Sequence, residues 1–406
     1  MAQIKPFRAL RPHVEYAAQV ASRPYDVLTS EEAKKEAEGN LLSFLHITKS
    51  EIDLPAETNV YSNEVYDVAK ANLQKLVKEK VLFQEEKPCY YIYRLQWKGR
   101  VQTGLVCVSS VEDYFNDVIK KHEFTRPEKE QDRINHMRIT RGQTGNVFLA
   151  CKDIKELNDI FKHWTEHNIA DYNFTADDGV QHTVWVVHAA ATIDIITHLF
   201  AEKVAFTYIA DGHHRAASAA KVSKELTDSA DAQYFLTTIF PANQLAILDY
   251  NRVAKDLNGL SDEEFIIRVG ESFRIEKSSE AVTPSKLHQF GMYLGNQWYN
   301  LEAKENSYRS DPIGVLDVTI LQENILDRIL HIQDPRTDKR IDFVGGIRGV
   351  AELEKKVNSG DCKVAFSLHP VTIQQLFDIA DSGGVMPPKS TWFEPKLRDG
   401  LLTHLI

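Results

Sequence analysis

The segment Val204–Ala220 constrains the fold more than any other stretch, because it predicts a strand, a polar turn and a helix in direct succession. Residues 204–209 are rich in β-branched and aromatic side chains, which are typical of a buried strand. Residues 216–224 contain no proline or glycine and consist mainly of strong helix formers. Strands and helices interleave along the rest of the chain, so we expect an α+β (mixed α/β) fold.

The polar turn in this segment, Asp211-Gly-His-His-Arg215, has the composition of an anion-binding site. Gly212 permits a close approach of the backbone, and the first N–H groups of a helix lack partners within the helix. These groups lie at the positive end of the helix dipole, where phosphate binds readily. The pattern favours a phosphate site at the turn, formed by Gly212, His213, His214 and Arg215. An ordinary strand–helix joint with Asp211 as its N-cap remains the alternative.

The composition excludes several classes of protein. The 406 residues include 48 basic and 58 acidic residues, and this net charge of −10 argues against a non-specific nucleic-acid surface. No apolar run is long enough to cross a bilayer, and the first residues lack the apolar core of a signal peptide. We therefore expect a cytoplasmic protein that binds no membrane. The sequence leaves open whether the chain forms a homo-oligomer. The four cysteines are Cys89, Cys107, Cys151 and Cys362. They form no CxxC pair, which argues against a zinc or redox motif.

Hydrophobic periodicity and turn residues predict further elements. Hairpins are expected from Tyr90–Trp97 with Thr103–Val108, and between Phe174 and His188 around the turn Asp177-Asp-Gly179. Helices are expected near residues 12–20, 30–39, 62–82, 153–168, 315–330 and 371–380, with Asp153 as the cap of the fourth. We expect three parts: a core of residues 1–50, 200–250 and 340–406, a β-rich inserted region over 51–199, and an α+β region over 251–339.

Three other motifs combine polar side chains, and each has an ordinary alternative. Pro12-His-Val-Glu15 places an imidazole and a carboxylate near a helix start, where acidic residues are common in any case. The charged run His122–Arg133 is typical of a solvated helix. Pro387-Pro-Lys-Ser-Thr391 couples a stiff segment to three donors, or is simply a connecting turn.

Transition-metal binding is not expected at the two adjacent histidines. Neighbouring residues at a helix start point in different directions, and the spacing offers no third or fourth ligand to His213 and His214. Mg²⁺ held by Asp211 together with phosphate oxygens is the metal chemistry that the residues favour.

Nearly the whole chain resembles the bacterial family catalogued as domain of unknown function 1015. Several separate motifs appear in the order typical of that family, although the family name implies no chemistry. They are Lys5–Pro12, Arg23–Leu28, His122–Pro127, Ile209–Arg215, Met386–Thr391 and Phe393–Arg398.

The turn Asp211–Arg215 is also similar to the signature of the ParB/sulfiredoxin-like fold, in which such a turn holds nucleotide phosphates. This implies a ParB/sulfiredoxin-like nucleotide-binding core with a large β-rich insertion. Within that fold, free-serine kinases share a Pro-His-Glu, an Asp-Gly-His-His-Arg and a Pro-Lys-Thr-Thr motif in the same order. The resemblance implies Glu15 as catalytic base, Asp211 and Arg215 as further catalytic residues, and ATP or ADP with Mg²⁺ as cofactors. It also implies a substrate site formed by His13, Glu123, Arg126, Lys389, Ser390 and Thr391.

We therefore expect a small-molecule kinase that phosphorylates a hydroxyl amino acid, with free L-serine as the first candidate. A sulfiredoxin-like reductase is excluded because that chemistry needs a cysteine in the signature turn, where His213 stands. A ParB-like nucleotide-binding regulatory protein and a non-catalytic metabolite sensor remain as alternatives, since binding and turnover would need nearly the same residues.

Overall fold

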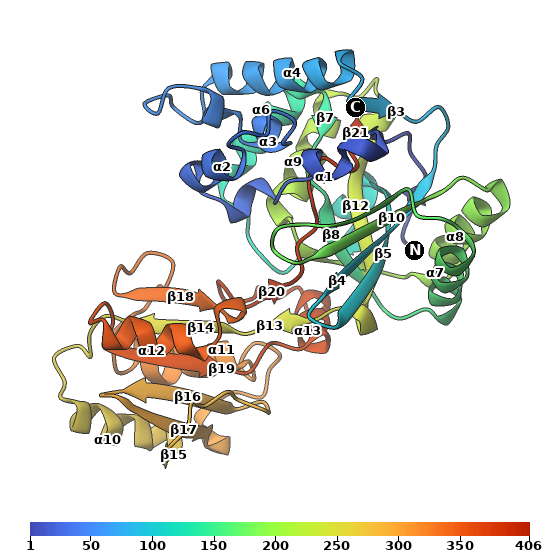
Figure 1. Ribbon diagram of the computed structural model, residues 1–406. Coiled ribbons are helices and arrows are strands. Elements are labelled where there is room, and N and C mark those ends of the chain that lie inside the picture. Colours follow the sequence, from blue (N-terminus) through green and yellow to red (C-terminus); the bar gives the residue numbers. More distant parts are fainter. The chain divides into compact units, whose positions relative to one another are not determined.

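The computed structural model describes residues Met1–Ile406 and divides the chain into two compact units (Figure 1). Unit 1 comprises Met1–Leu245 and Pro395–Ile406, and unit 2 comprises Ala246–Glu394. The chain thus leaves unit 1 once, forms unit 2, and returns to unit 1 for residues 395–406.

This division groups the residues differently from the expected three parts. Residues 51–199 lie in the same compact unit as residues 1–50 and 200–245. Residues 340–394 lie in unit 2 together with residues 251–339.

A nine-stranded mixed sheet forms the centre of unit 1. Its order is β6-β11-β8-β12-β5-β4-β10-β9, with β1 added to β5. Only the pairs β11–β6 and β12–β8 are parallel, as the α+β (mixed α/β) expectation allows. The strands are β1 Ile4–Lys5, β4 Tyr90–Trp97, β5 Arg100–Ser110, β6 Ile119–Lys120, β8 Val147–Cys151, β9 Tyr172–Thr175, β10 Gln181–Val187, β11 Thr207–Asp211 and β12 Tyr234–Pro241.

Both predicted hairpins are present in this sheet. The strands β4 and β5 pair from Tyr91 opposite Val106 to Trp97 opposite Arg100. Their tight turn is possible because Lys98 and Gly99 both have positive φ, at 48° and 77°. The strands β9 and β10 form the second hairpin, and β10 also pairs with β4.

Helices flank this sheet, and their ends follow local chemistry. They are α1 Ala17–Val20, α2 Ser30–Glu36, α3 Leu45–Thr48, α4 Asn63–Lys78, α5 Val111–Phe115, α6 Pro127–Thr140, α7 Lys155–His167, α8 Ala190–Lys203 and α9 His213–Glu225. Helix α2 begins with the capping box of Thr29 and Glu32. No helix has the length and apolarity that crossing a bilayer requires.

Three helix predictions were wrong in detail. The helix expected over 62–82 ends at Lys78, because Lys80 adopts a left-handed conformation with φ 57° and Leu82 begins the short strand β3. The helix expected from Pro12 is a 3-10 turn over Val14–Tyr16 followed by the single-turn helix α1. Asp153 does not cap α7, whose N-cap is Ile154; its carboxylate accepts from the backbone N–H of Asn243 at 2.9 Å instead.

Two short strand pairs complete unit 1. The strand β2 (Leu10–Pro12) pairs with β3 (Leu82–Gln84). The strand β21 (His404–Leu405) pairs with β7 (Gly142–Gln143) and so fixes the returning C-terminal segment in unit 1. All four cysteines of the chain are free and buried.

Unit 2 has its own antiparallel sheet of six strands in the order β15-β17-β16-β19-β14-β18. These strands are β14 Tyr250–Ala254, β15 Phe273–Ser278, β16 Gln289–Leu294, β17 Gln297–Ala303, β18 Ile341–Gly345 and β19 Val364–Leu368. The helices are α10 Asp262–Ser272, α11 Asp317–Leu321, α12 Val350–Asn358 and α13 Ile373–Asp381. The helix predicted over 315–330 is only partly α-helical, because α11 continues as a π-helix over Gln322–Asp327.

The two ends of unit 2 are joined to each other. The strand β13 (Ile247–Leu248) pairs with β20 (Trp392–Phe393), with Ile247 opposite Phe393. The unit also has its own apolar core, formed by Val253, Val282, Tyr293, Trp298, Val344, Leu353, Cys362 and Ala365.

We expect a fragment of residues 246–394 to fold on its own, because its sheet, core and paired ends are all internal to it. Chemical denaturation followed by circular dichroism should show one cooperative transition. A fragment that stops at residue 391 lacks β20 and the buried Phe393, so its midpoint should be lower. A non-cooperative unfolding curve for the longer fragment would contradict the independence of unit 2.

Candidate functional site

The polar turn connects β11 to α9 in unit 1 through a single glycine. Gly212 has φ 97° and ψ 32° and is itself the N-cap of α9, which begins at His213. A side chain here would be strained by the positive φ and would meet the Arg215 guanidinium at 3.0 Å. The alternative in which Asp211 caps the helix is therefore wrong. No side chain caps α9, so the N–H groups of its first turn keep the character of an anion site.

Arg215 is the buried centre of the site. Its guanidinium donates to the backbone oxygen of Asn146, to Asp211 Oδ2 at 2.9 Å and to Asp26 Oδ2 at 3.3 Å. Only 7% of its side chain is exposed. The residue that the sequence predicts as a phosphate ligand thus donates to three protein oxygens and holds three separate segments together. Its phosphate role stays a prediction.

Asp211 lies between two cations. Besides Arg215, the ammonium of Lys396 lies 3.6 Å from Asp211 Oδ2. Burial alone would raise the pKa of Asp211, but Lys396 and Arg215 together lower it well below its ordinary value. The carboxylate is therefore ionised at neutral pH and remains 29% exposed, so it can accept hydrogen bonds from a ligand.

A second carboxyl, that of Asp399, is buried beside the same arginine. The ideal Cβ of a residue replacing Gly145 would lie 3.2 Å from Arg215 Cδ and 3.5 Å from Asp399 Oδ1, so glycine allows both side chains to approach. Burial raises the pKa of Asp399 to about 7, although the charge of Arg215 opposes this shift. Arg215 Nε and Asp399 Oδ2 are both buried without a hydrogen-bond partner.

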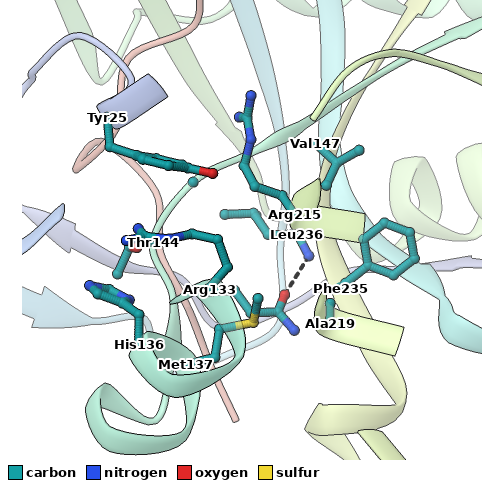
Figure 2. A pocket seen from close by; sticks show the side chains of 12 residues that line it. Tyr25, Arg133, His136, Met137, Thr144, Val147, Arg215, Ala219, Phe235 and Leu236 are labelled. Atoms are coloured by element: carbon teal, nitrogen blue, oxygen red, sulfur yellow. Dashed lines mark hydrogen bonds between the residues drawn. The ribbon is translucent and has the colours of Figure 1, made fainter. Parts of the chain in front are cut away.

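A small cavity of about 20 Å³ lies beside these groups. Figure 2 shows Tyr25, Arg133 and Arg215 among its lining side chains. The Arg133 guanidinium lies 4.0 Å from the centre of the Tyr25 ring. A cavity of this size holds about one water molecule and no nucleotide.

The two histidines of the turn contact the His122–Pro127 motif. His213 Nε2 accepts from the backbone N–H of His122 at 3.4 Å, and His214 Nε2 accepts from that of Arg126 at 2.9 Å. Because each Nε2 is an acceptor, the proton of each neutral ring is on Nδ1. Burial lowers the pKa of both rings, so they are neutral donors at physiological pH. His213 Nδ1 faces Glu123 Oε2 at 3.6 Å.

The structure thus brings Glu123 and Arg126 close to the turn, and their substrate role stays a prediction. The side chain of Glu123 is 58% exposed, and Phe124 beside it is 74% exposed. Residues 122–126 have no regular secondary structure, and the charged run beyond Pro127 forms the start of α6, as predicted. Two members of that run, Glu130 and Arg133, are buried and not solvated.

Glu15 and His13 also belong to unit 1. Glu15 is exposed on the 3-10 turn Val14–Tyr16 and makes no hydrogen bond or ion pair with the turn Asp211–Arg215. The ring of His13 packs 4.5 Å from that of Phe83. The roles of Glu15 and His13 stay predictions.

Lys389, Ser390 and Thr391 belong to unit 2. Lys389 is exposed with φ 57°, Ser390 is buried, and Thr391 is half-buried. Ser390 Oγ donates to the backbone oxygen of Pro387 at 2.6 Å, which closes a local turn. The substrate role of these three residues stays a prediction.

The residues do not fit direct coordination of Mg²⁺. No group of three or more histidine, cysteine or acidic side chains has a geometry that could hold a metal ion. Asp211 Oδ2, the predicted ligand, already faces Arg215 and Lys396, whose positive charges oppose a divalent cation at the same oxygen.

Sequence reasoning missed four residues that complete the site: Asp26, Asn146, Lys396 and Asp399. Asp26 and Lys396 lie within family motifs quoted above, which was a usable signal. Asn146 and Asp399 carried none, because they are brought in by contacts over 69 or more residues of sequence.

Comparison with known proteins identifies the family and little else. The family model described as "Protein of unknown function (DUF1015)" matches residues 4–319, which confirms the family predicted from the motifs. No curated protein matches the chain.

Several solved structures show a weak likeness. A free serine kinase variant in complex with AMP is 12% identical and has a TM-score of 0.37, with 75% of this chain and 92% of that chain covered. A conserved hypothetical protein from Pyrococcus furiosus is 14% identical at TM-score 0.35, with 75% and 95% covered. A C-terminally truncated SbnI from Staphylococcus aureus is 12% identical at TM-score 0.32, with 74% and 87% covered. Likenesses of this size support no statement about the present chain, and the ParB/sulfiredoxin-like core stays a prediction.

We expect Arg215→Ala to lower the free energy of unfolding by about 3 kcal/mol, because Asp26 and Asp211 lose their shared cation and a buried cavity opens. Urea denaturation of the full chain measures this change. The matched control is Arg138→Ala, which removes a surface ion pair with Glu225 near the other end of α9 and should cost less than about 1 kcal/mol. Similar losses in both variants would contradict the central role of Arg215.

The raised pKa of Asp399 predicts that the free energy of unfolding changes with pH. Its pKa is about 7 when folded and near that of a free aspartate when unfolded, so between these values only the folded protein binds this proton. Its contribution to stability therefore falls as the pH rises toward 7. Between pH 5 and 7.5 the wild type should lose about 2 kcal/mol more than Asp399→Asn. Denaturation at each pH measures this difference, and the exposed-site control Asp67→Asn should follow the wild type.

Proposed function

The chain belongs to the DUF1015 family, and from the site in unit 1 we propose that it binds a nucleotide and transfers a phosphoryl group to the hydroxyl of a small molecule. Free L-serine is the first candidate for the acceptor, and ATP or ADP for the donor. The acceptor and donor come from the motif resemblance to free-serine kinases, whereas the phosphate site is argued from the residues themselves.

One observation carries the proposal: segments distant in sequence meet at the uncapped start of α9. Asp26 reaches Arg215, residues 122–126 reach both histidines, and Lys396 reaches Asp211. A purely structural joint between a strand and a helix would need only a cap. The joint between β11 and α9 instead combines uncapped N–H groups, an ionised carboxylate and neutral imidazole donors.

These groups suit phosphoryl transfer, which depends on positioning and charge stabilisation more than on covalent chemistry. The N–H groups at the start of α9 would bind phosphate oxygens, with His214 Nδ1–H as a further donor. Lys396 would add positive charge near the same position. Asp211, held ionised by its two cations, would accept a hydrogen bond from the acceptor and orient it. Glu15 would take the proton of the acceptor hydroxyl.

The test is incubation of the full chain with ATP or ADP, magnesium and free hydroxyl amino acids, followed by mass spectrometry of the products. We expect O-phosphoserine from the wild type. Glu15→Gln should abolish turnover and leave nucleotide affinity nearly unchanged, because the exposed Glu15 makes no hydrogen bond or ion pair with the turn Asp211–Arg215 and would act only on the acceptor proton. The control Glu38→Gln changes another exposed glutamate of unit 1 and should keep full activity.

The outcomes separate the parts of the proposal. Nucleotide binding without any phosphorylated product would favour a metabolite sensor or a ParB-like regulatory protein. An equal loss of binding and turnover in Glu15→Gln would contradict its assignment as base. A wild type that binds no nucleotide would refute the proposed phosphate site.

A further inference from the structure

Unit 2 contains a cavity of about 310 Å³ that takes no part in the site described above. Arg252 of β14, Val318 of α11 and Gln322 at the start of the π-helix line it, together with the loop Gln333–Arg336 and the prolines Pro387 and Pro388. All of these residues belong to unit 2. The volume is in the range of small-molecule sites, whereas the cavity beside Arg215 holds about one water molecule.

Arg252 is the notable residue in this cavity, because it is a buried cation without a carboxylate partner. Its residue exposure is 4%, and no carboxylate is among the groups that act electrostatically on it. It donates to three backbone oxygens, those of Tyr250, Pro388 (3.3 Å) and Lys389 (3.0 Å). Burial lowers the pKa of Arg252 to about 10, with only Tyr250 opposing the shift.

This arrangement differs from that of the other buried arginines. Arg215 faces Asp26 and Asp211, Arg133 faces Asp132, and Arg398 faces Asp178. Proteins rarely bury a charged side chain without a countercharge, because desolvation of the ion is then uncompensated. Backbone oxygens satisfy part of the guanidinium, which has five N–H donors, but they do not neutralise it.

The other polar side chains that line the cavity do not neutralise the positive charge of Arg252. The lining side chains Asp334 and Arg336 pair with each other through two contacts of 2.9 Å, so they cancel. Gln322 donates from Nε2 to the backbone oxygen of Ile332 at 2.7 Å. It sits where α11 changes to a π-helix, a local irregularity that is frequent at functional sites. The cavity therefore has one uncompensated positive charge.

We propose that this cavity is a binding site for a small organic anion with a carboxylate or phosphate group, which pairs with Arg252. The planar guanidinium suits either group, since both present two oxygens at matching spacing. Pro387 and Pro388 hold the acceptors of Arg252 on a stiff segment, so the side chain is oriented before the ligand arrives. The inference is independent of the proposed phosphoryl transfer.

The experiment is isothermal titration calorimetry on the full chain with three probes: inorganic phosphate, O-phospho-L-serine and succinate. Sodium chloride at matched ionic strength controls for screening. At least one probe should bind saturably, with a dissociation constant in the millimolar range or tighter. Binding of phosphate and phosphoserine alone identifies a phosphate site, and binding of succinate identifies a carboxylate site.

Variants of the residues that line the cavity test whether the anion binds there. Arg252→Gln should weaken binding at least tenfold, and Arg252→Lys should be intermediate because it keeps the charge without the planar fork. Gln333→Trp fills the cavity from an exposed lining position and should also abolish binding, even where the Arg252 variants fail to fold. The matched control is Arg274→Gln, an exposed arginine on β15 of the same unit, which should bind as the wild type does.

Two results would overturn the proposal. One is the absence of saturable binding for all three probes. The other is binding that survives in Arg252→Gln and Gln333→Trp but is lost in Asp211→Asn, since that would place the anion in unit 1. Because these probes are not phosphoryl donors, failure here leaves the kinase assay of unit 1 unaffected.

Discussion

The buried guanidinium of Arg215 is the interaction on which the arrangement of unit 1 depends most. It joins the N-terminal Asp26, the loop oxygen of Asn146 and the end of β11 at Asp211. None of these segments is next to another in sequence, and a polar cluster of this kind is stable only when nearly every member is satisfied. The turn at Gly212 lets α9 begin at His213 and so places Arg215 in the first turn of the helix, four residues after Asp211, which is the local condition for this network.

The same network explains why unit 1 needs a segment from beyond unit 2. Lys396 supplies the second cation of Asp211, and Asp399 fills the other side of Arg215. The short pair β21–β7 fixes the segment by backbone hydrogen bonds. Unit 2 can be accommodated in the sequence because its own ends are paired through β13 and β20, so its internal fold does not depend on this segment.

Local sequence patterns predicted the helices and strands better than they predicted the residues that meet at Arg215. The hairpin of β4 and β5 and the succession of β11 and α9 were predictable, because turn chemistry and periodicity act over a few residues. The caps were less predictable: Asp153 and Asp211 both look like N-caps, yet tertiary partners engage their carboxylates. The partners of Arg215 were least predictable, because they come from loops and termini whose approach is set by the whole sheet.

The insertion of unit 2 has a consequence for synthesis on the ribosome. Arg215 and its first two carboxylates are made before residue 246, but Lys396 and Asp399 follow only after another 149 residues of unit 2 have been translated. During that interval Asp211 lacks one of its two cations, and unit 2 can complete its own sheet. The charge cluster is therefore assembled late, and a chain interrupted within unit 2 carries the Asp-Gly-His-His-Arg turn without a finished site.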